Sequence, residues 1–313
     1  MRIIVASRRT SVIGSIELDD HRYTDHRRVT AADSERRRDL ARRGTCPDCG
    51  GEYTRLAMHW RGPCSPPLLS TDVTNLLAGL LLDDGFVGGN GPNKHFQFST
   101  RWRPFAAWFF DELGWLAARA TRVDHPGRPE PNQQYVVRTH AHPDLNQFRA
   151  WYTDSEGTGR GDHHLPAPDD LPAGRLTPRA GRAWYAASGS VAWSDPAYAT
   201  TRQASFSAAA DERAARVLVL LESVGLEPTR AGRRVQLSPK QTSAWLEWIG
   251  DPVPGVDYKW AADVEEYREA KRDAETWRAW LFHRPDEDEA LGIDSSAASG
   301  HPRGATSCAE RRR

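Results

Sequence analysis

Three cysteines and one histidine near the N-terminus have the spacing of metal ligands. Cys46, Cys49, His59 and Cys64 follow the pattern C-x2-C-x9-H-x4-C. Three thiolates and one imidazole complete the tetrahedral shell of a structural zinc site, and a glycine pair after the second cysteine permits the tight turn that such a site needs. The sequence therefore predicts a zinc knuckle over residues 46–67. The alternatives are unrelated thiols or a reactive CxxC pair.

A second group of candidate residues lies at the end of a leucine-rich segment that reads LAGLLLDDG from Leu77 to Gly85. Ala78 and Gly79 provide a small surface on which another helix can approach closely. Two adjacent carboxylates, Asp83 and Asp84, stand at the foot of this helix. They are either part of a functional site or merely end a buried helix before the glycine.

A fainter copy of this segment begins at Thr177-Pro178 and ends at Gly189, with Ser188 in the place of the acid. Threonine before a helix and proline in its first position are typical helix starts. Each copy precedes a strand, an amphipathic helix, a second strand and a tryptophan-bearing helix. This internal repeat predicts an α+β fold with a pseudo-twofold axis. The expected segments are 95–100, 102–118, 134–139 and 143–152, then 203–208, 211–224, 233–238 and 240–249.

The segment Leu77–Gly85 resembles the signature of the LAGLIDADG homing endonucleases. Leu77, Ala78, Gly79, Leu80, Asp84 and Gly85 are identical to that signature. Further matches to the single-chain, two-repeat group of the family follow in order over about residues 72–260. They are Phe96–Ser99, Arg138-Thr139, His142-Pro143, Trp151-Tyr152, Trp184–Ser190, Ser205–Ser207, Ser238–Lys240 and Tyr258-Lys259.

This resemblance implies two αββαββα repeats, residues 72–176 and a degenerate copy at 177–260, whose antiparallel sheets form a saddle for double-stranded DNA. It implies a sequence-specific endonuclease of an intron- or intein-type mobile element that hydrolyses phosphodiester bonds with Mg²⁺. Asp84 would bind the Mg²⁺, and Lys240, or else Lys94, would assist electrostatically. Because Ser188 replaces the second acid, strand nicking is expected to be favoured over double-strand cleavage. The resemblance also implies a helix interface formed by Ala78, Gly79, Gly85 and Gly189.

Alternation along the expected strands predicts which side chains face DNA. Phenylalanine, valine and leucine alternate with polar residues, so the polar residues share the outer face of each strand. Arg, Gln, Ser and His are suited to base edges in the major groove, although a merely solvated sheet face is the alternative. The predicted DNA-facing residues are His95, Gln97, Ser99, Arg138, Gln203, Ser205, Ser207, Arg234 and Gln236.

The rest of the chain limits the class of protein. The formal net charge is zero, so a polyanion must be held by a local basic face. No apolar run has the length of a membrane span or a signal peptide, which predicts an intracellular, cytoplasmic protein. The resemblance to the two-repeat group implies a monomer with an internal pseudo-dimer. We also expect a basic arm at 1–45, a C-terminal helix at 261–283 and a disordered tail at 284–313. Two other functions stay open, a catalytically inactive DNA-binding or RNA-maturase-like protein and a zinc-finger DNA-binding regulator.

Overall fold

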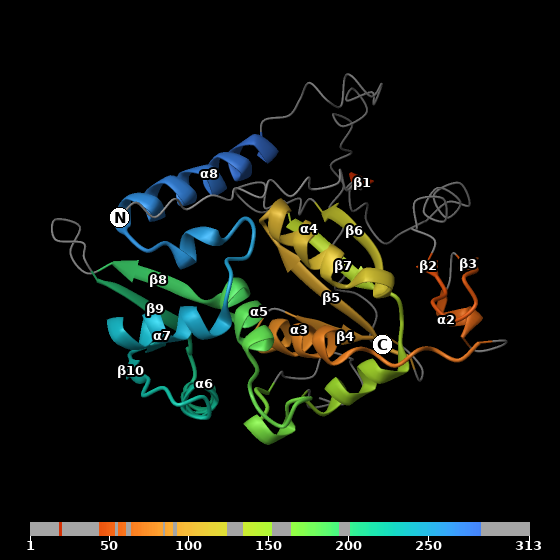
Figure 1. The fold of residues 1–313 in the computed structure, drawn as a ribbon, viewed down its shortest axis with the longest axis horizontal. Coiled ribbons are helices and arrows are strands. Elements are labelled where there is room, and N and C mark those ends of the chain that lie inside the picture. Colours follow the sequence, from red (N-terminus) through yellow and green to blue (C-terminus); the bar gives the residue numbers. More distant parts are fainter. Residues whose placement is uncertain are drawn as a thin grey trace, which may run out of the picture.

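A computed structural model describes the part of the chain that carries both copies of the repeat (Figure 1). The described residues are 19–20, 44–53, 56–60, 64–83, 85–89, 93–123, 134–151, 164–193 and 201–282. Most of the predicted basic arm (1–45), the predicted tail (284–313) and Asp84 lie outside these residues.

The first repeat is a helix followed by two strand pairs that are separated by a second helix. Its sheet has the order β1-β6-β7-β5-β4, in which only β1 (Asp19–Asp20) is parallel to its neighbour. The elements are α3 (Thr71–Leu81), β4 (Phe86–Gly88), β5 (His95–Thr100), α4 (Arg103–Glu112), β6 (Ala117–Val123), β7 (Gln134–Thr139) and the 3₁₀ helix η2 (Pro143–Trp151).

The second repeat has the same element order and the same strand order. Its sheet runs β10-β11-β9-β8, which matches β6-β7-β5-β4 strand for strand. The elements are α5 (Pro178–Ser188), β8 (Ser190–Trp193), β9 (Arg202–Ser207), α6 (Asp211–Glu222), β10 (Thr229–Ala231), β11 (Arg234–Gln236) and α7 (Pro239–Ile249). The predicted α+β architecture of two repeats with antiparallel sheets is confirmed.

Some predicted boundaries are wrong. The helix expected over 102–118 ends at Glu112, because Gly114 adopts a positive φ of 54°, and β6 begins at Ala117. The segment 143–152 forms a 3₁₀ helix over Pro143–Trp151. Residue periodicity also missed the short strands β4, β8 and β10, which are too short to show an alternating pattern.

Helices α3 and α5 lie side by side between the two sheets (Figure 1). Both begin with side-chain caps, since Ser70 accepts a hydrogen bond from the Val73 amide and Thr177 accepts one from the Ala180 amide. A Cβ atom at Gly79 would lie only 2.1 Å from the carbonyl oxygen of Ala180. The two backbones therefore meet at a distance that only glycine permits at this position.

Aromatic side chains fill the space between each sheet and its helices. In the first repeat, Phe96 and Phe98 of β5 pack on Phe109 of α4 with ring centroids 5.6 Å apart. In the second, Phe206 of β9 packs on Trp184 of α5 with centroids 4.3 Å apart. These contacts place the polar residues of β5 and β9 on the opposite face of each sheet.

The chain continues past the second repeat into the 3₁₀ helix η4 (Asp257–Trp260) and the helix α8 (Val264–Phe282), near the predicted C-terminal helix at 261–283. Tyr258 and Tyr267 join these two elements with ring centroids 5.9 Å apart. Among the described residues, no helix combines the length and apolar character needed to cross a membrane.

The first prediction concerns the approach of α3 and α5. Gly79→Ala should lower the free energy of unfolding by about 1–3 kcal/mol, because the new methyl group meets the rigid Ala180 carbonyl. Glu247→Ala is the control within a helix, since Glu247 is an exposed residue of α7. We expect the control to differ from wild type by less than about 1 kcal/mol in urea titrations. Equal effects of the two substitutions would contradict the prediction.

Candidate functional site

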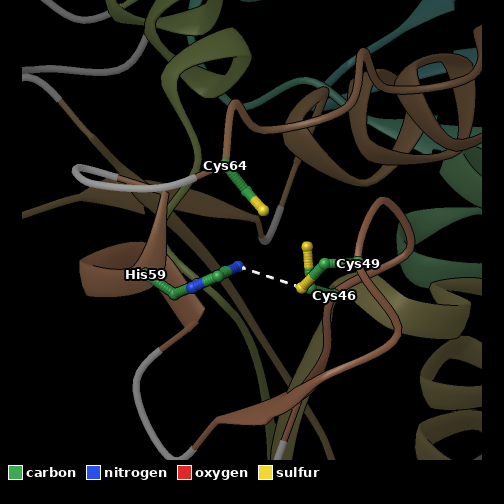
Figure 2. A group of neighbouring side chains, drawn as sticks. All are labelled: Cys46, Cys49, His59 and Cys64. Atoms are coloured by element: carbon green, nitrogen blue, oxygen red, sulfur yellow. Dashed lines mark hydrogen bonds between the residues drawn. The ribbon is translucent and has the colours of Figure 1, made fainter.

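The cysteine and histidine side chains predicted to bind zinc converge on one point (Figure 2). Cys46 and Cys49 lie on the turn between β2 (Gly44–Thr45) and β3 (Glu52–Tyr53), and His59 ends the short helix α2 (Leu56–His59). The ligand atoms of these residues and Cys64 all lie within 4.8 Å of one another. In a tetrahedral zinc site, thiolate sulfurs are about 3.8 Å apart, so the donors need to move little to fit the ion.

Electrostatics around the thiols also fit a cation. Burial raises the pKa of Cys46, but hydrogen bonds from the backbone at Cys49 and Asp48 lower it to about 6, with smaller contributions from the neighbouring Trp60 and His59 side chains. Burial and the neighbouring thiols of Cys49 and Cys46 raise the pKa of Cys64 to about 12. Several thiolates can therefore form together only when a positive ion offsets their repulsion. The donor set and its surroundings fit zinc.

The cysteine module packs on the first repeat through its own small core. Cys46, Leu56 and Trp60 are buried together. Trp60 contacts Trp115 edge to face, with ring centroids 5.5 Å apart, and lies 5.4 Å from the ring of His142. Leu56 and Trp60 therefore lie beside the metal-ligand group, and the aromatic contacts hold the module against the first repeat.

At the end of α3, an aspartate is held by charged and polar groups from the second repeat. Asp83 forms an ion pair with Arg213 of α6, and the same guanidinium donates to the Leu82 carbonyl at 3.1 Å. Burial raises the pKa of Asp83, while Arg213, the Ser188 hydroxyl and Lys259 oppose this shift without cancelling it. The Ser188 hydroxyl itself donates to the Trp184 carbonyl of its own helix at 3.2 Å, and it lies close enough to Asp83 to affect the pKa of that acid.

Lys259 is a functional candidate that residue spacing did not single out. Its ammonium group is buried and donates to the carbonyls of Ala186 at 2.7 Å and Tyr185 at 3.3 Å, at the C-terminal end of α5. Lys240, the predicted electrostatic partner, lies exposed in the first turn of α7, and Lys94 donates to the Gly89 carbonyl at 2.7 Å. The catalytic role predicted for Lys240 stays a prediction. The family-like pair Tyr258-Lys259 was the available signal for Lys259.

The small residues predicted at the helix interface divide into two groups. Ala78 and Gly79 are buried, and Gly79 meets the partner helix. Gly85 and Gly189 instead lie against their own helices, because a Cβ at Gly189 would be 2.0 Å from the Tyr185 ring and one at Gly85 would be 3.0 Å from Leu80. These two glycines allow tight helix ends where a contact between helices was expected.

The outer face of the first sheet carries the polar side chains that the alternation predicts. His95, Gln97 and Ser99 are half-buried, whereas Phe96 and Phe98 are fully buried. Arg138 of β7 pairs with Gln97 in register and donates from Nε to its Oε1 at 3.2 Å. Arg119 of β6 is the cross-strand partner of Arg138. The sequence analysis did not include Arg119 among the DNA-facing residues.

The second sheet agrees with the alternation in most positions. Gln203 and Gln236 are half-buried and Ser207 and Arg234 are exposed. Ser205 differs from the prediction. It is only 3% exposed, and its hydroxyl lies 2.8 Å from that of Ser190 on β8. The short side chain is covered and paired across strands, so its availability to a ligand is less than predicted.

The cations on the first sheet determine the charge of the histidine among them. Burial, together with Arg138, Arg119 and Lys94, lowers the pKa of His95 to about 4. His95 is therefore neutral at pH 7 and offers one hydrogen-bond donor and one acceptor. The positive charge of this face comes from the arginines and Lys94.

The fold is similar to that of a homing endonuclease of known structure. No protein-family model and no curated protein matches the sequence. The homing endonuclease I-WcaI bound to its DNA recognition sequence is 13% identical, with a TM-score of 0.51 over 63% of this chain and 89% of that one. The LAGLIDADG meganuclease I-AabMI bound to uncleaved DNA is 11% identical, with a TM-score of 0.35 over 66% of this chain and 98% of that one. Full-length DUF199/WhiA from Thermatoga maritima is 13% identical, with a TM-score of 0.36 over 75% and 69%. The chain has the LAGLIDADG fold.

The second prediction concerns the pH dependence of folding. The pKa of His95 is about 4 in the folded state against an ordinary value of 6.5, so the unfolded chain binds more protons between these values. Stability is therefore complete above about pH 6.5 and falls as the pH drops toward 4. His95→Gln should flatten this fall in thermal unfolding scans from about pH 7.5 to about pH 4.5.

Burial also lowers the pKa of His142, so this histidine too makes the protein less stable as the pH drops. Only the difference between wild type and His95→Gln therefore reports on His95. His164→Gln serves as a control, since that side chain is 43% exposed. A His95→Gln profile that runs parallel to wild type would contradict the neutral state assigned to His95.

Proposed function

We propose that this protein is a sequence-specific double-stranded DNA-binding endonuclease of the LAGLIDADG type that acts as a monomer with an internal pseudo-dimer. The observation that carries the proposal is the pair of sheets of identical strand order, flanking one helix pair, with polar outer faces. The likeness to a homing endonuclease bound to its DNA recognition sequence supports the same use of these faces. DNA would lie along both sheets.

Binding by an electrically neutral chain depends on local charge. Arg119 and Arg138 lie side by side on the first outer face, Lys94 lies near enough to lower the pKa of His95, and Arg234 is exposed on the second sheet. Cationic side chains release counterions from DNA and provide affinity, while amide and hydroxyl groups contact base edges. The residues proposed to contact DNA are His95, Gln97, Ser99, Arg138, Gln203, Ser207, Arg234 and Gln236, with Arg119 added and Ser205 reduced in importance.

For cleavage, we propose that Asp84 binds a catalytic Mg²⁺ near the pseudo-twofold axis. When bound, the ion would activate water and stabilise charge on the phosphate and the leaving oxygen. Ser188 replaces the acid of the second repeat, and a neutral hydroxyl is a weak Mg²⁺ ligand. Lys259 would add positive potential at this end of α5, and Lys240 remains the alternative proposed from the family-like motif. An intron- or intein-type mobile element is the proposed context.

The cysteine module is proposed to be a structural zinc site. A closed set of Cys46, Cys49, His59 and Cys64 leaves no open position for a substrate, so the ion would act on folding. Its proposed role is to hold residues 44–64 against Trp115 and His142 of the first repeat.

A DNA-binding protein without nuclease activity is the second candidate. Two observations favour it. Ser188 replaces the second acid, and the charge of Asp83, which is next to Asp84 in the sequence, is balanced by an ion pair with Arg213. Such a protein would bind the same duplex through the same faces and leave both strands intact. An RNA-maturase-like role or a zinc-dependent regulatory role would also use this fold without cleavage.

The third prediction tests the nuclease. The substrate is a supercoiled plasmid that carries a selected binding site, incubated with Mg²⁺. The protein should convert it to the nicked form much faster than to the linear form, because Asp84 can hold a metal ion for the cleavage of one strand and Ser188 cannot do so for the other. Asp84→Asn should abolish nicking with nearly unchanged duplex affinity in a gel-shift assay. Asp72→Asn, an exposed acid in the first turn of the same helix, is the matched control and should keep wild-type activity.

Equal, rapid cutting of both strands would contradict this asymmetry and require another residue to supply the missing ligand. Tight duplex binding without any nicking would instead favour the binding protein. Preference for single-stranded or hairpin RNA over duplex DNA in competition would favour the maturase-like role.

The fourth prediction tests the zinc site. Purified protein should contain one zinc ion per chain by elemental analysis. Cys46→Ser should lose the ion and lower the thermal midpoint, because the ion adds binding free energy to the folded state. Asp48→Asn is the matched control, since Asp48 lies on the same turn but outside the ligand set, and it should keep the metal. Unchanged zinc content in Cys46→Ser would contradict the assignment.

A further inference from the structure

Four outward-facing residues form one register row across the first sheet. Phe86 of β4 pairs with Gln97 of β5, Gln97 pairs with Arg138 of β7, and Arg138 pairs with Arg119 of β6. Cross-strand partners share a face of the sheet. The buried residues Phe96, Phe98 and Val137 occupy the opposite face. The row therefore lies on the proposed DNA-binding surface and combines an exposed aromatic ring, an amide and two guanidinium groups.

The corresponding row of the second sheet has different chemistry. Ser190 of β8 pairs with Ser205 of β9, Ser205 pairs with Gln236 of β11, and Gln236 pairs with Thr229 of β10. The Ser190 and Ser205 hydroxyls bind each other at 2.8 Å. Two matched rows thus differ by two positive charges, so the two halves of the surface cannot recognise the same bases in the same way.

Within the first row, Gln97 and Arg138 act as one unit. The Gln97 Oε1 atom accepts hydrogen bonds from Nε of Arg138, at 3.2 Å, and from Nη2 of the same guanidinium. The acceptor atom of the Gln97 side chain is therefore engaged inside the protein. What remains available is the Gln97 amide N–H₂ and the unused N–H groups of Arg138, all of them donors.

A row of donors discriminates between the two purines. Guanine presents two acceptors in the major groove, O6 and N7, which a guanidinium can bind together. Adenine presents one acceptor and one donor, and glutamine recognises it by using its carbonyl oxygen as the acceptor. Because Arg138 occupies that oxygen, the N6 donor of adenine would be left without a partner.

We propose that the Gln97–Arg138 unit selects guanine in the DNA half-site under the first sheet, with Arg138 as the reading residue and Gln97 as its positioning residue. The proposal rests on the duplex-binding function proposed above and adds the base that this half of the surface prefers. Arg119, beside Arg138 in register, adds positive charge but no acceptor for the N6 donor of adenine. The neutral row of the second sheet makes no such selection.

The experiment is a selection from a randomised duplex DNA library with the full-length protein, followed by Kd measurements on single-base variants of the selected duplex at several salt concentrations. Guanine at one position of one half-site should be favoured over adenine by about tenfold or more. Gln97→Leu should reduce this ratio and leave the salt dependence unchanged, because it removes the orienting acceptor but no charge. Arg138→Lys should reduce the ratio as well, since lysine keeps the charge but lacks the two parallel N–H groups with which a guanidinium binds guanine.

Gln236→Leu, at the position of the second sheet that corresponds to Arg138, is the control and should alter base preference in the other half-site only. Thermal unfolding of each variant verifies that it is folded. A selected adenine whose preference disappears in Gln97→Leu would overturn the proposal, because Gln97 would then read the base itself. A defined selected duplex without the guanine would overturn this inference alone. The absence of any sequence-selective duplex binding would contradict the proposed function as well.

Discussion

The contact between the backbones of α3 and α5 is the constraint on which the rest of the architecture depends. With no side chain at Gly79, the two helices meet at the carbonyl of Ala180. Each helix leads directly into the first strand of its own sheet, β4 or β8, so the distance between the helices determines how the two sheets face a common partner. A larger residue at position 79 would move both sheets relative to each other.

The same contact brings the ends of the two helices together, where the repeats have diverged. Asp83 of the first repeat meets Ser188 and Arg213 of the second, and Lys259 closes the end of α5. Positive groups from the second repeat thus balance the acid of the first. This distribution stabilises the helix ends with the protein's own charges and leaves one repeat with the proposed metal ligand. An asymmetric reaction, or binding alone, follows from this arrangement more readily than symmetric cleavage.

Divergence of the two halves also extends to their outer faces. The strand order is the same in both sheets, yet the matched rows contain arginines in one and hydroxyl groups in the other. A neutral chain can therefore carry a local basic face, because Arg119 and Arg138 lie side by side on the outer face of the first sheet. The cysteine module is packed against this first half through Trp60 and Trp115, which gives that half additional rigid contacts.

Local sequence determined the features that depend on neighbours along the chain. The alternation of Phe96 and Phe98 with polar residues predicted the two faces of β5, Thr177-Pro178 predicted the start of α5, and ligand spacing predicted the cluster that includes Cys46. These features follow from the period of a strand, the geometry of a cap and the reach of a short loop. The repeated order of such segments predicted an α+β fold of two copies, and the resemblance to the LAGLIDADG signature predicted the αββαββα order that includes the short strands.

Only the tertiary structure decided which distant groups meet. Asp83 and Arg213 are 130 residues apart, and Gln97 and Arg138 are 41 apart, so no local pattern indicates either pair. The burial of Ser205 depends on Ser190 across the sheet, and Lys259 reaches the end of α5 from beyond the second repeat. Hydrogen bonds and ion pairs of this kind depend on positions in space, which the packing of α3 against α5 establishes after the local elements have formed.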